Sequence, residues 1–205
     1  YEWRLVLRSI ILFIYLINYL KFSIMLKLRK LTENDIEKVR LWRMNPEISK
    51  YMFSDPKITY EEQIEWFKTV KKDETRKYWI IEFDSKDIGL LSLMNIDLYN
   101  KNCLWAYYIV DVNLRGKGIG KNLECNIHDY VFHELKLNKI YGDALDENKK
   151  VLEIHKHFGY RIEGELKEQI YKNGKFHNLI KIGILSKEWE NIRKNYQYTK
   201  IEIET

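Results

Sequence analysis

The sequence predicts an α/β protein in which a mixed β-sheet of about seven strands is flanked by helices. Three observations support this fold class. Along the chain, apolar residues recur in some segments at every second position, as in strands, and in others at every third or fourth position, as in helices. The 205 residues, of which 45% are hydrophobic, suit one globular domain with its own core. A glycine-rich turn lies between one expected strand and the helix that follows it.

The chain opens with an apolar stretch, Leu5–Ile24, that Arg8 and Lys21 interrupt. A transmembrane helix needs about 20 apolar residues, and a secretory signal needs a small-residue cleavage site. The stretch is marginal on the first criterion and fails the second. Because Met25 stands directly before the first patterned strand, we interpret the stretch as lying outside the native product, with a membrane anchor as the alternative. The sequence thus divides into an extension, a main domain and a tail, at residues 1–24, 25–190 and 191–205.

The first part of the domain is predicted to contain a strand and two helices. Leu26, Leu28 and Leu31, separated by polar side chains, indicate a short strand with one buried face. A threonine followed three residues later by an acidic side chain has the spacing of a capping box, which marks a helix start. Two such pairs occur, Thr32 with Asp35 and Thr59 with Glu62. The Asn45-Pro46 pair ends the first helix, because a residue before proline avoids the helical region.

Strands and helices then alternate. Strands are expected at residues 78–83, 88–94, 104–110 and 139–145, with a final hairpin of residues 168–171 and 179–185 around Asn173-Gly174. Helices are expected at residues 119–135 and 148–157, and Gly159 stops the second of them. The strand at 104–110 is almost continuously apolar, which predicts burial on both of its faces.

The charge of the chain is modestly positive: 35 Lys and Arg against 30 Asp and Glu give a net charge of +5. Because the basic residues are scattered, this charge suits an anionic small ligand such as a nucleotide or the phosphates of CoA, and not a nucleic acid. Cys103 and Cys125 have neither metal-ligand nor redox-motif spacing. No metal is therefore expected, and two lone thiols fit a reducing cytoplasm.

The most informative segment is Arg115-Gly116-Lys117-Gly118-Ile119-Gly120. Its glycines let the backbone approach a ligand closely, and the helix start directs unpaired N–H groups and a positive dipole end toward an anion. These features predict a pyrophosphate site. A turn that only packs the helix on the strand is one alternative. A Rossmann turn is the other, and it is disfavoured because three or more strands precede the motif. A P-loop is excluded because no Gly-Lys-Ser/Thr follows.

The glycine segment and a second motif together resemble the GNAT N-acetyltransferases. Arg115-x-x-Gly118-x-Gly120 matches the acetyl-CoA signature of that family, and residues 148–160, from Asn148 to Gly159-Tyr160, are similar to its second signature. The resemblance covers Leu26 to about Trp189. It implies the GNAT fold, acetyl-CoA as the co-substrate, and transfer of the acetyl group to a primary amine.

The resemblance also implies where acetyl-CoA binds. Backbone groups at Ile109 and Val110, at the end of the strand, would polarise the thioester carbonyl. Asn148 would contact the CoA arm. The pyrophosphate would lie on Arg115, Gly116, Lys117, Gly118, Ile119 and Gly120.

Three residues are candidates for the chemistry by the same resemblance. His155 occupies the position where many relatives carry a tyrosine that protonates the leaving thiolate, and an imidazole is able to donate a proton near neutral pH. Asp143 is the candidate base, with a water relay through Ser92. The alternatives are that His155 only packs near the surface, that Asp143 is a solvated carboxylate at the end of a strand, and that the reaction needs no dedicated base.

The resemblance narrows toward enzymes of the pseudaminic acid pathway, which acetylate the 4-amino group of UDP-4-amino-4,6-dideoxy-N-acetyl-β-L-altrosamine. The segments that carry it are Leu41-Trp42-Arg43, residues 46–53 and residues 58–67. Met44 and Gln63 stand where that group usually has Asn and His. On this resemblance Met52, Phe53 and Trp66 would sandwich the uracil ring, and Arg43 would meet a phosphate. The alternative is that these aromatic side chains belong to the core.

Other functions remain open at this stage. One alternative is acetylation of spermidine or of the N-terminus of a ribosomal protein. Lys50, Lys57 and Lys68, near the presumed acceptor side, weigh against a polycation such as spermidine. A non-enzymatic CoA-binding domain is another. The expected partner is a small nucleotide-sugar amine, and members of this family often form homodimers.

Overall fold

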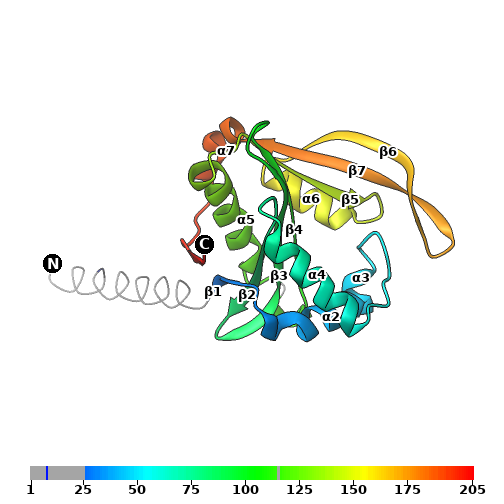
Figure 1. Cartoon of the computed structure of the whole chain (residues 1–205). Helices are drawn as coiled ribbons and strands as arrows, with labels where there is room; N and C mark the ends of the chain where they lie inside the picture. Colours follow the sequence, from blue (N-terminus) through cyan, green and yellow to red (C-terminus); the bar gives the residue numbers. More distant parts are fainter. Residues whose placement is uncertain (1–7, 9–25, 115) are drawn as a thin grey trace.

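The computed structural model of the chain describes Arg8, residues 26–114 and residues 116–205 (Figure 1). Its strands form one eight-stranded sheet in the order β6-β7-β5-β4-β3-β2-β1-β8. The β4–β5 and β1–β8 pairs are parallel, and the other neighbours are antiparallel. The strands are β1 (Leu26–Lys30), β2 (Lys77–Phe83), β3 (Lys86–Asp97), β4 (Asn102–Ile109), β5 (Lys139–Leu145), β6 (Arg161–Lys172), β7 (Lys175–Leu185) and β8 (Glu202–Ile203).

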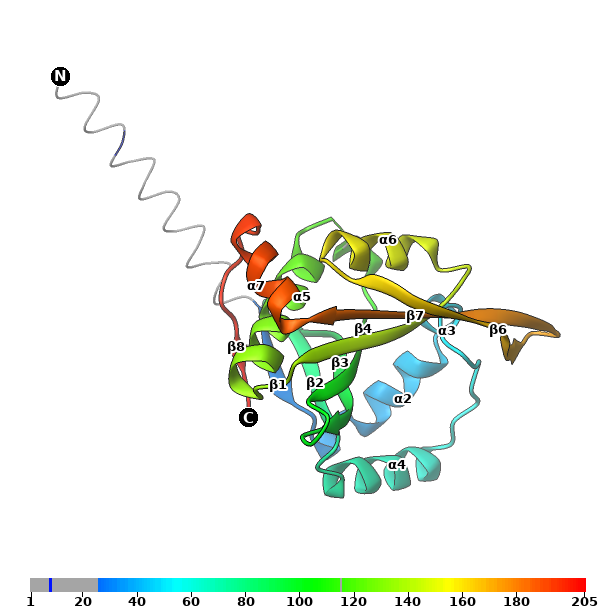
Figure 2. The same ribbon diagram turned by 90° about the horizontal axis from the view of Figure 1, so that it is seen from above.

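Helices cover both faces of the sheet, as Figure 2 shows. On one face lie α2 (Ile36–Met44) and α4 (Tyr60–Lys72), and on the other lie α5 (Ile119–Asp129), α6 (Lys149–His157) and α7 (Ser186–Ile192). The core follows this division. A small cluster of Val39, Ile80 and Leu90 packs under α2 and α4, while a much larger cluster that includes Leu123, Ile127 and Trp189 fills the other face.

The two capping boxes form as the sequence predicts. The backbone N–H and the hydroxyl of Thr32 both donate to Asp35 at 2.9 Å, just before α2. At the start of α4, Thr59 and Glu62 exchange reciprocal hydrogen bonds of 2.8 and 3.2 Å. A third short helix, α3 (Pro46–Ser49), follows α2, because Asn45 accepts from the N–H of Glu47 and Pro46 suits a first helical turn.

The parallel ladder between β4 and β5 is short. It joins only three residue pairs, Asn102 with Lys139, Cys103 with Ile140, and Leu104 with Tyr141. Beyond these pairs β4 continues to Ile109 and β5 to Leu145 without being hydrogen-bonded to each other. The sheet therefore opens between β4 and β5, at the C-terminal ends of these two strands.

This opening changes the burial that the apolar sequence predicts for β4. Cys103 and Trp105 are buried, but Ala106 is exposed, and the strand from Tyr107 onward is only partly buried. The expectation of burial on both faces is wrong for this end of the strand, because β5 no longer lies beside it.

The C-terminal segment contributes an eighth strand that the sequence pattern does not reveal. β8 pairs with β1, and Asn122 and Asn126 on α5 accept from the backbone N–H groups of Thr199 and Ile201 at 2.9 and 3.0 Å. The segment set apart as a tail is thus part of the folded unit. Only two residues pair with β1, which is too short a run for alternation to be detected.

The predicted extension, residues 1–24, lies outside the described residues except for Arg8. Within the part of the chain that the structure describes, no helix has the length and hydropathy needed to cross a membrane.

A glycine on β3 sets the position of the end of β4. A Cβ on Gly89 would lie 2.0 Å from the carbonyl oxygen of Tyr108. We expect Gly89→Ala to lower the free energy of unfolding by about 1–3 kcal/mol, because one strand must move away from the other. Urea unfolding measures this change. Gly164→Ala is the control, since a Cβ there meets nothing within 4 Å, and equal stability of the two variants would contradict the close approach.

Candidate active site

Unpaired backbone donors line the opening between β4 and β5. The N–H of Val110 donates to Ile88 on β3 at 2.8 Å. Because successive N–H groups of a strand point to opposite sides, those of Ile109 and Tyr107 point away from β3 and into the opening. Of the two expected backbone donors, Ile109 is therefore available to polarise a carbonyl, whereas the N–H of Val110 is already used.

The glycine-rich turn at the start of α5 has the form of an anion cradle. Gly116 and Gly118 adopt φ values of +79° and +77°, and a Cβ on either would meet nothing within 4 Å. In the described part of the chain, the N–H groups of Gly118, Ile119 and Gly120 donate to no protein acceptor, and the first helical bond of α5 runs from Asn122 to Gly118 at 3.1 Å. Open space therefore lies beside Gly116 and Gly118 at a helix start, which is the setting in which backbone N–H groups bind anions.

The remaining residues of this loop have different roles. Arg115 lies outside the described residues. Lys117 is exposed, and its N–H closes the turn onto Leu114 at 3.4 Å. Ile119 is buried and anchors the helix start in the core. A Cβ on Gly120 would lie 3.2 Å from the hydroxyl of Tyr107, so a small residue is required there.

Asn148 lies just beyond the end of β5, at the start of α6. Its side chain is buried, and its N–H donates to Leu145 at 2.9 Å. Its carbonyl accepts the first bonds of α6, while its side-chain amide forms no hydrogen bond with the described residues. The amide is thus free to contact a ligand arm that runs along the opening.

His155 lies on the face of the sheet that carries α5. Its Nδ1 is 3.0 Å from Oε1 of Glu124, a carboxylate that is 0% exposed. Its ring packs edge-on against Trp105, the first β4 residue beyond the ladder, at 5.7 Å and 75°. The candidate acid therefore lies next to the opening and beside a buried carboxylate.

A second histidine completes this buried cluster. Nε2 of His128 is 2.8 Å from the hydroxyl of Tyr160 and 3.6 Å from Oε2 of Glu124. Burial lowers the pKa of His128 to about 3, with a smaller contribution from His155. Burial raises the pKa of Glu124, and the neighbouring imidazole of His155 opposes that shift.

Ser92 and Asp143 belong to the opposite face. Ser92 is buried on β3 and donates to the carbonyl of Ala106 at 3.3 Å. Asp143 on β5 forms an ion pair of 2.7 Å with Lys181, its register partner on β7. Alternation along the strands places both on the face that α2 and α4 cover. The candidate base Asp143 and its relay Ser92 thus lie on the face of the sheet opposite His155.

Of the four residues expected to bind the acceptor, Arg43 and Met52 are in contact, while Phe53 and Trp66 are described by their own surroundings. Arg43 on α2 lies against the sulfur of Met52, so these two are brought together. Phe53 is 40% exposed. Trp66 packs edge-on against Tyr78 at 5.2 Å and 80°, within the small cluster under α2 and α4.

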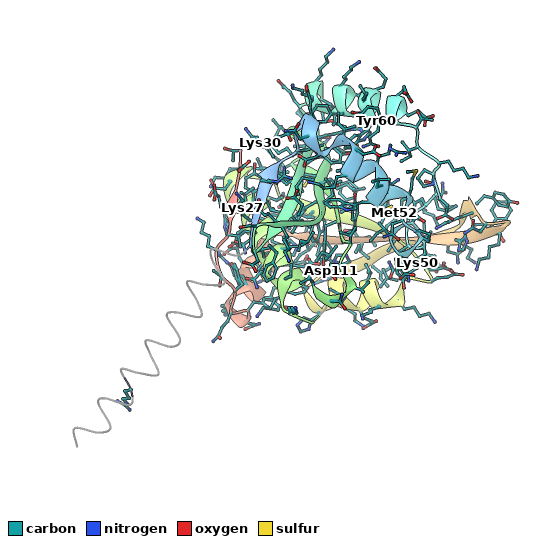
Figure 3. All side chains as sticks on the ribbon, turned by 90° about the horizontal axis from the view of Figure 1, so that it is seen from below. Lys27, Lys30, Lys50, Met52, Tyr60 and Asp111 are labelled. Carbon is teal, nitrogen blue, oxygen red and sulfur yellow. The ribbon has the colours of Figure 1, made fainter. Side chains whose placement is uncertain are left out.

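A buried lysine holds the loop that carries Met52. The ammonium of Lys172, near the tip of the β6–β7 hairpin, donates to the carbonyls of Ser49, Lys50 and Met52 at 2.7, 3.2 and 3.0 Å. It also pairs with Asp55 at 3.3 Å. Figure 3 shows Lys50 and Met52 beside the ribbon of that hairpin. The hairpin therefore forms one wall of the acceptor side.

The sequence profile of the acetyltransferase (GNAT) domain matches residues 25–161. The chain belongs to the GNAT acetyltransferase family. Acetyltransferase PseH of Campylobacter jejuni is 31% identical over 147 residues, which cover 70% of this chain and 90% of that protein. Spermidine N(1)-acetyltransferase of Escherichia coli is 26% identical over 163 residues, which cover 80% of this chain and 87% of that protein.

A solved structure supports the same assignment. Spermidine N-acetyltransferase from Vibrio cholerae, in complex with CoA and spermine, matches with a TM-score of 0.75 and 27% identity. The match covers 82% of this chain and 99% of that chain. The GNAT fold and acetyl-CoA as co-substrate, both expected from the sequence, are thereby confirmed. Among the described residues, no group of three His, Cys, Asp or Glu side chains is placed to hold a metal ion.

Sequence reasoning missed two residues of this GNAT site, Glu124 and Lys172. Glu124 falls within the apolar steps of α5, next to Leu123 and four residues before His128. The available signal was the pair of titratable residues Glu124 and His128, which stand four residues apart beside the apolar face of α5. Lys172 gave no local signal, because its partners lie more than a hundred residues away in the sequence.

Gly118 tests the pyrophosphate cradle. We expect Gly118→Ala to raise the Kd for CoA about tenfold or more, because a side chain enters the open space and strains the left-handed backbone. Isothermal titration calorimetry with CoA measures this. Gly174→Ala is a matched control, since Gly174 has φ +78° and equally open surroundings in the β6–β7 turn. Equal CoA affinity of the two variants would place the cradle elsewhere.

His128 makes stability depend on pH in the acidic range. An unfolded imidazole takes up a proton near about pH 6.5, whereas folded His128 does so only at about 3. Stability is therefore lost as the pH falls below about 6.5, at up to about 1.4 kcal/mol per unit. Urea unfolding at several pH values should show that His128→Gln reduces this loss. His157→Gln, on the exposed side of α6, should retain the wild-type dependence.

Proposed function

We propose that this N-acetyltransferase acetylates the 4-amino group of a UDP-linked 4-amino-4,6-dideoxy sugar. The acceptor assignment extends the resemblance of residues 41–67 to the pseudaminic acid pathway enzymes. The similarity to acetyltransferase PseH over 70% of the chain supports it.

The observation that carries the proposal is the environment of Arg43. Among the residues that the structure describes, its guanidinium forms no ion pair and lies against Met52. It is close enough to Tyr108 to oppose the rise in pKa that burial causes in that phenol. The Tyr108 hydroxyl is itself buried and has no hydrogen-bond partner within the described ranges. A free guanidinium beside an unused hydroxyl suits a phosphorylated, hydroxyl-bearing acceptor.

Four acidic residues on this side are already paired, which weighs against a site for a polycation. Each of four carboxylates already pairs with a cation of the same chain. The pairs are Glu37 with Arg40, Glu47 with Lys50, Asp55 with Lys172 and Asp143 with Lys181. A polyamine would have to displace these cations, at the cost of exposing or unpairing them. Spermidine is the second candidate, because the E. coli and V. cholerae relatives carry that name.

The proposed reaction uses both faces of the opening. The amine nitrogen of the sugar attacks the thioester carbon while the N–H of Ile109 holds the carbonyl oxygen. The nitrogen loses a proton toward Asp143, through a water beside Ser92. The carbon–sulfur bond then breaks, and the thiolate takes a proton from His155.

An acceptor screen tests the proposal directly. The full chain is incubated with acetyl-CoA and one amine at a time, and free CoA is measured with a thiol reagent. We expect kcat/KM for UDP-4-amino-4,6-dideoxy-N-acetyl-β-L-altrosamine to exceed that for spermidine and for ribosomal-protein peptides by about a hundredfold or more. Higher turnover of spermidine would establish the second candidate. Binding of CoA without turnover of any amine would favour a non-enzymatic domain.

Arg43 tests the anionic acceptor separately. We expect Arg43→Gln to raise KM for the nucleotide sugar about tenfold to a hundredfold with kcat little changed, because a charge-assisted bond of about 1.5–3 kcal/mol is lost. Steady-state kinetics at fixed acetyl-CoA measures both constants. Lys68→Gln, in an exposed pair with Glu65 on α4, is the control. An unchanged KM in the Arg43 variant would remove the main support for a phosphorylated acceptor.

A further inference from the structure

We propose that Glu124 is a positioning residue that orients His155 and stabilises its protonated form, so that Nε2 presents a proton to the leaving thiolate. This inference rests on the proposed role of His155 in acetyl transfer. It assigns a function to a buried carboxylate that the fold alone does not require.

The burial of Glu124 is the first observation. Its side chain is 0% exposed in the middle of α5, surrounded by the large core cluster. Neither oxygen has a hydrogen bond of good geometry, although Oε1 lies 3.0 Å from Nδ1 of His155. Burying a carboxylate without a partner is strongly unfavourable, and an apolar side chain would stabilise the core more. Its presence is therefore explained by the histidine and not by packing.

The orientation of the imidazole is the second observation. Nδ1 is the ring nitrogen near Glu124, 3.0 Å from Oε1, although the pair does not meet hydrogen-bond geometry among the described residues. Nε2 is thus the nitrogen left to donate elsewhere. Trp105 at 5.7 Å and Tyr160 at 5.0 Å hold the ring from two sides. The side chain remains 14% exposed. A carboxylate on one nitrogen and an open second nitrogen is the arrangement that orients a catalytic imidazole.

The other groups that face this pair stay neutral near neutral pH. Burial raises the pKa of Cys103 to about 12 and raises the pKa values of Tyr107 and Tyr160. Burial keeps His128 neutral. On α6 itself, Lys156 and His157 are exposed to solvent. Glu124 is thus the acidic group that the imidazole meets on its buried side. Burial raises the pKa of Glu124, and the neighbouring imidazole of His155 opposes that rise.

The proton account of the step is balanced. When the carbon–sulfur bond breaks, its electron pair stays on sulfur, and the Nε2 proton moves to that sulfur. His155 is left neutral with a proton on Nδ1, which Glu124 accepts as a hydrogen bond. Solvent returns a proton to Nε2 before the next turnover. No oxidant or further reactant is required.

The main test is Glu124→Gln, which keeps the side-chain volume and removes the charge. We expect kcat to fall about tenfold to a hundredfold, with the Kd for CoA unchanged in calorimetry. The basic limb of the kcat–pH profile should move to lower pH, because the imidazolium loses the anion that stabilises it. In a His155→Ala background the same substitution should change kcat less than about twofold, because it acts through His155.

Two further measurements keep the test decisive. A downfield imidazole N–H resonance in the proton NMR spectrum of the unliganded protein should disappear in both Glu124→Gln and His155→Ala. Glu124→Asp, which retains the charge on a shorter side chain, should restore part of kcat and of the pH profile even if the glutamine variant is less stable. Glu190→Gln is the matched control, since Glu190 pairs with His133 near the surface, and it should leave kcat and its pH profile unchanged.

The outcomes separate this inference from the proposed function. If wild-type protein releases CoA with an amine, but Glu124→Gln keeps the wild-type kcat and pH profile, the inference is wrong while the function stands. Full additivity of the two substitutions, with the resonance unaffected, would also overturn it. If no amine supports CoA release, the proposed function fails, and the loss of the resonance still decides whether the pair exists.

Discussion

The early separation of β4 from β5 is the constraint on which the site depends. Two parallel strands that are hydrogen-bonded along their full length would use their backbone groups on each other. Here the ladder stops after three pairs, so the N–H groups of Tyr107 and Ile109 are left facing an opening. The glycine-rich turn and α5 begin just after this end of β4. In the proposed site, the backbone donors for the thioester carbonyl and the turn for the pyrophosphate would thus lie on consecutive segments of the chain.

The opening also lets the two faces of the sheet serve different halves of the reaction. The α5 face is rich in buried aromatic rings and carries His155 beside Glu124. The α2 and α4 face carries Asp143 with its cationic partner, and the loop that Lys172 fixes. In the proposed reaction, an acetyl group held between the strands is reached by an acid from one face and by an acceptor from the other. Acid and base then cannot neutralise each other directly.

Two buried charged side chains, Lys172 and Glu124, differ in how completely hydrogen bonds and ion pairs offset the cost of their burial. Lys172 satisfies its ammonium with three carbonyls and a carboxylate, which makes it a well-paired buried charge. Glu124 has no such set of donors and relies on the imidazole of His155. A structural ion pair is normally satisfied as fully as Lys172 is. The contrast within one molecule supports a functional reason for the carboxylate on α5.

Much of the fold was readable because it is encoded locally. The capping boxes at Thr32 and Thr59, the glycine-rich turn and the alternating strands are each set by neighbours in the sequence, and each forms as expected. The short helix α3 and the two-residue strand β8 were not predicted, because elements this short show no detectable periodicity of apolar residues. The loop residues Gly116 and Gly118 were identified for the same local reason, namely backbone conformations that only glycine adopts readily.

The sequence by itself determined most of the order of elements, the glycine-rich turn and the family that these imply. The tertiary structure alone decided which side chains meet across the sheet. The pairing of Asp143 with Lys181, of His155 with Glu124, and of Lys172 with the loop at Met52 joins residues that are distant in the chain. Such contacts depend on strand register and helix placement, which are set by packing of the whole core and leave no periodic trace in any one segment.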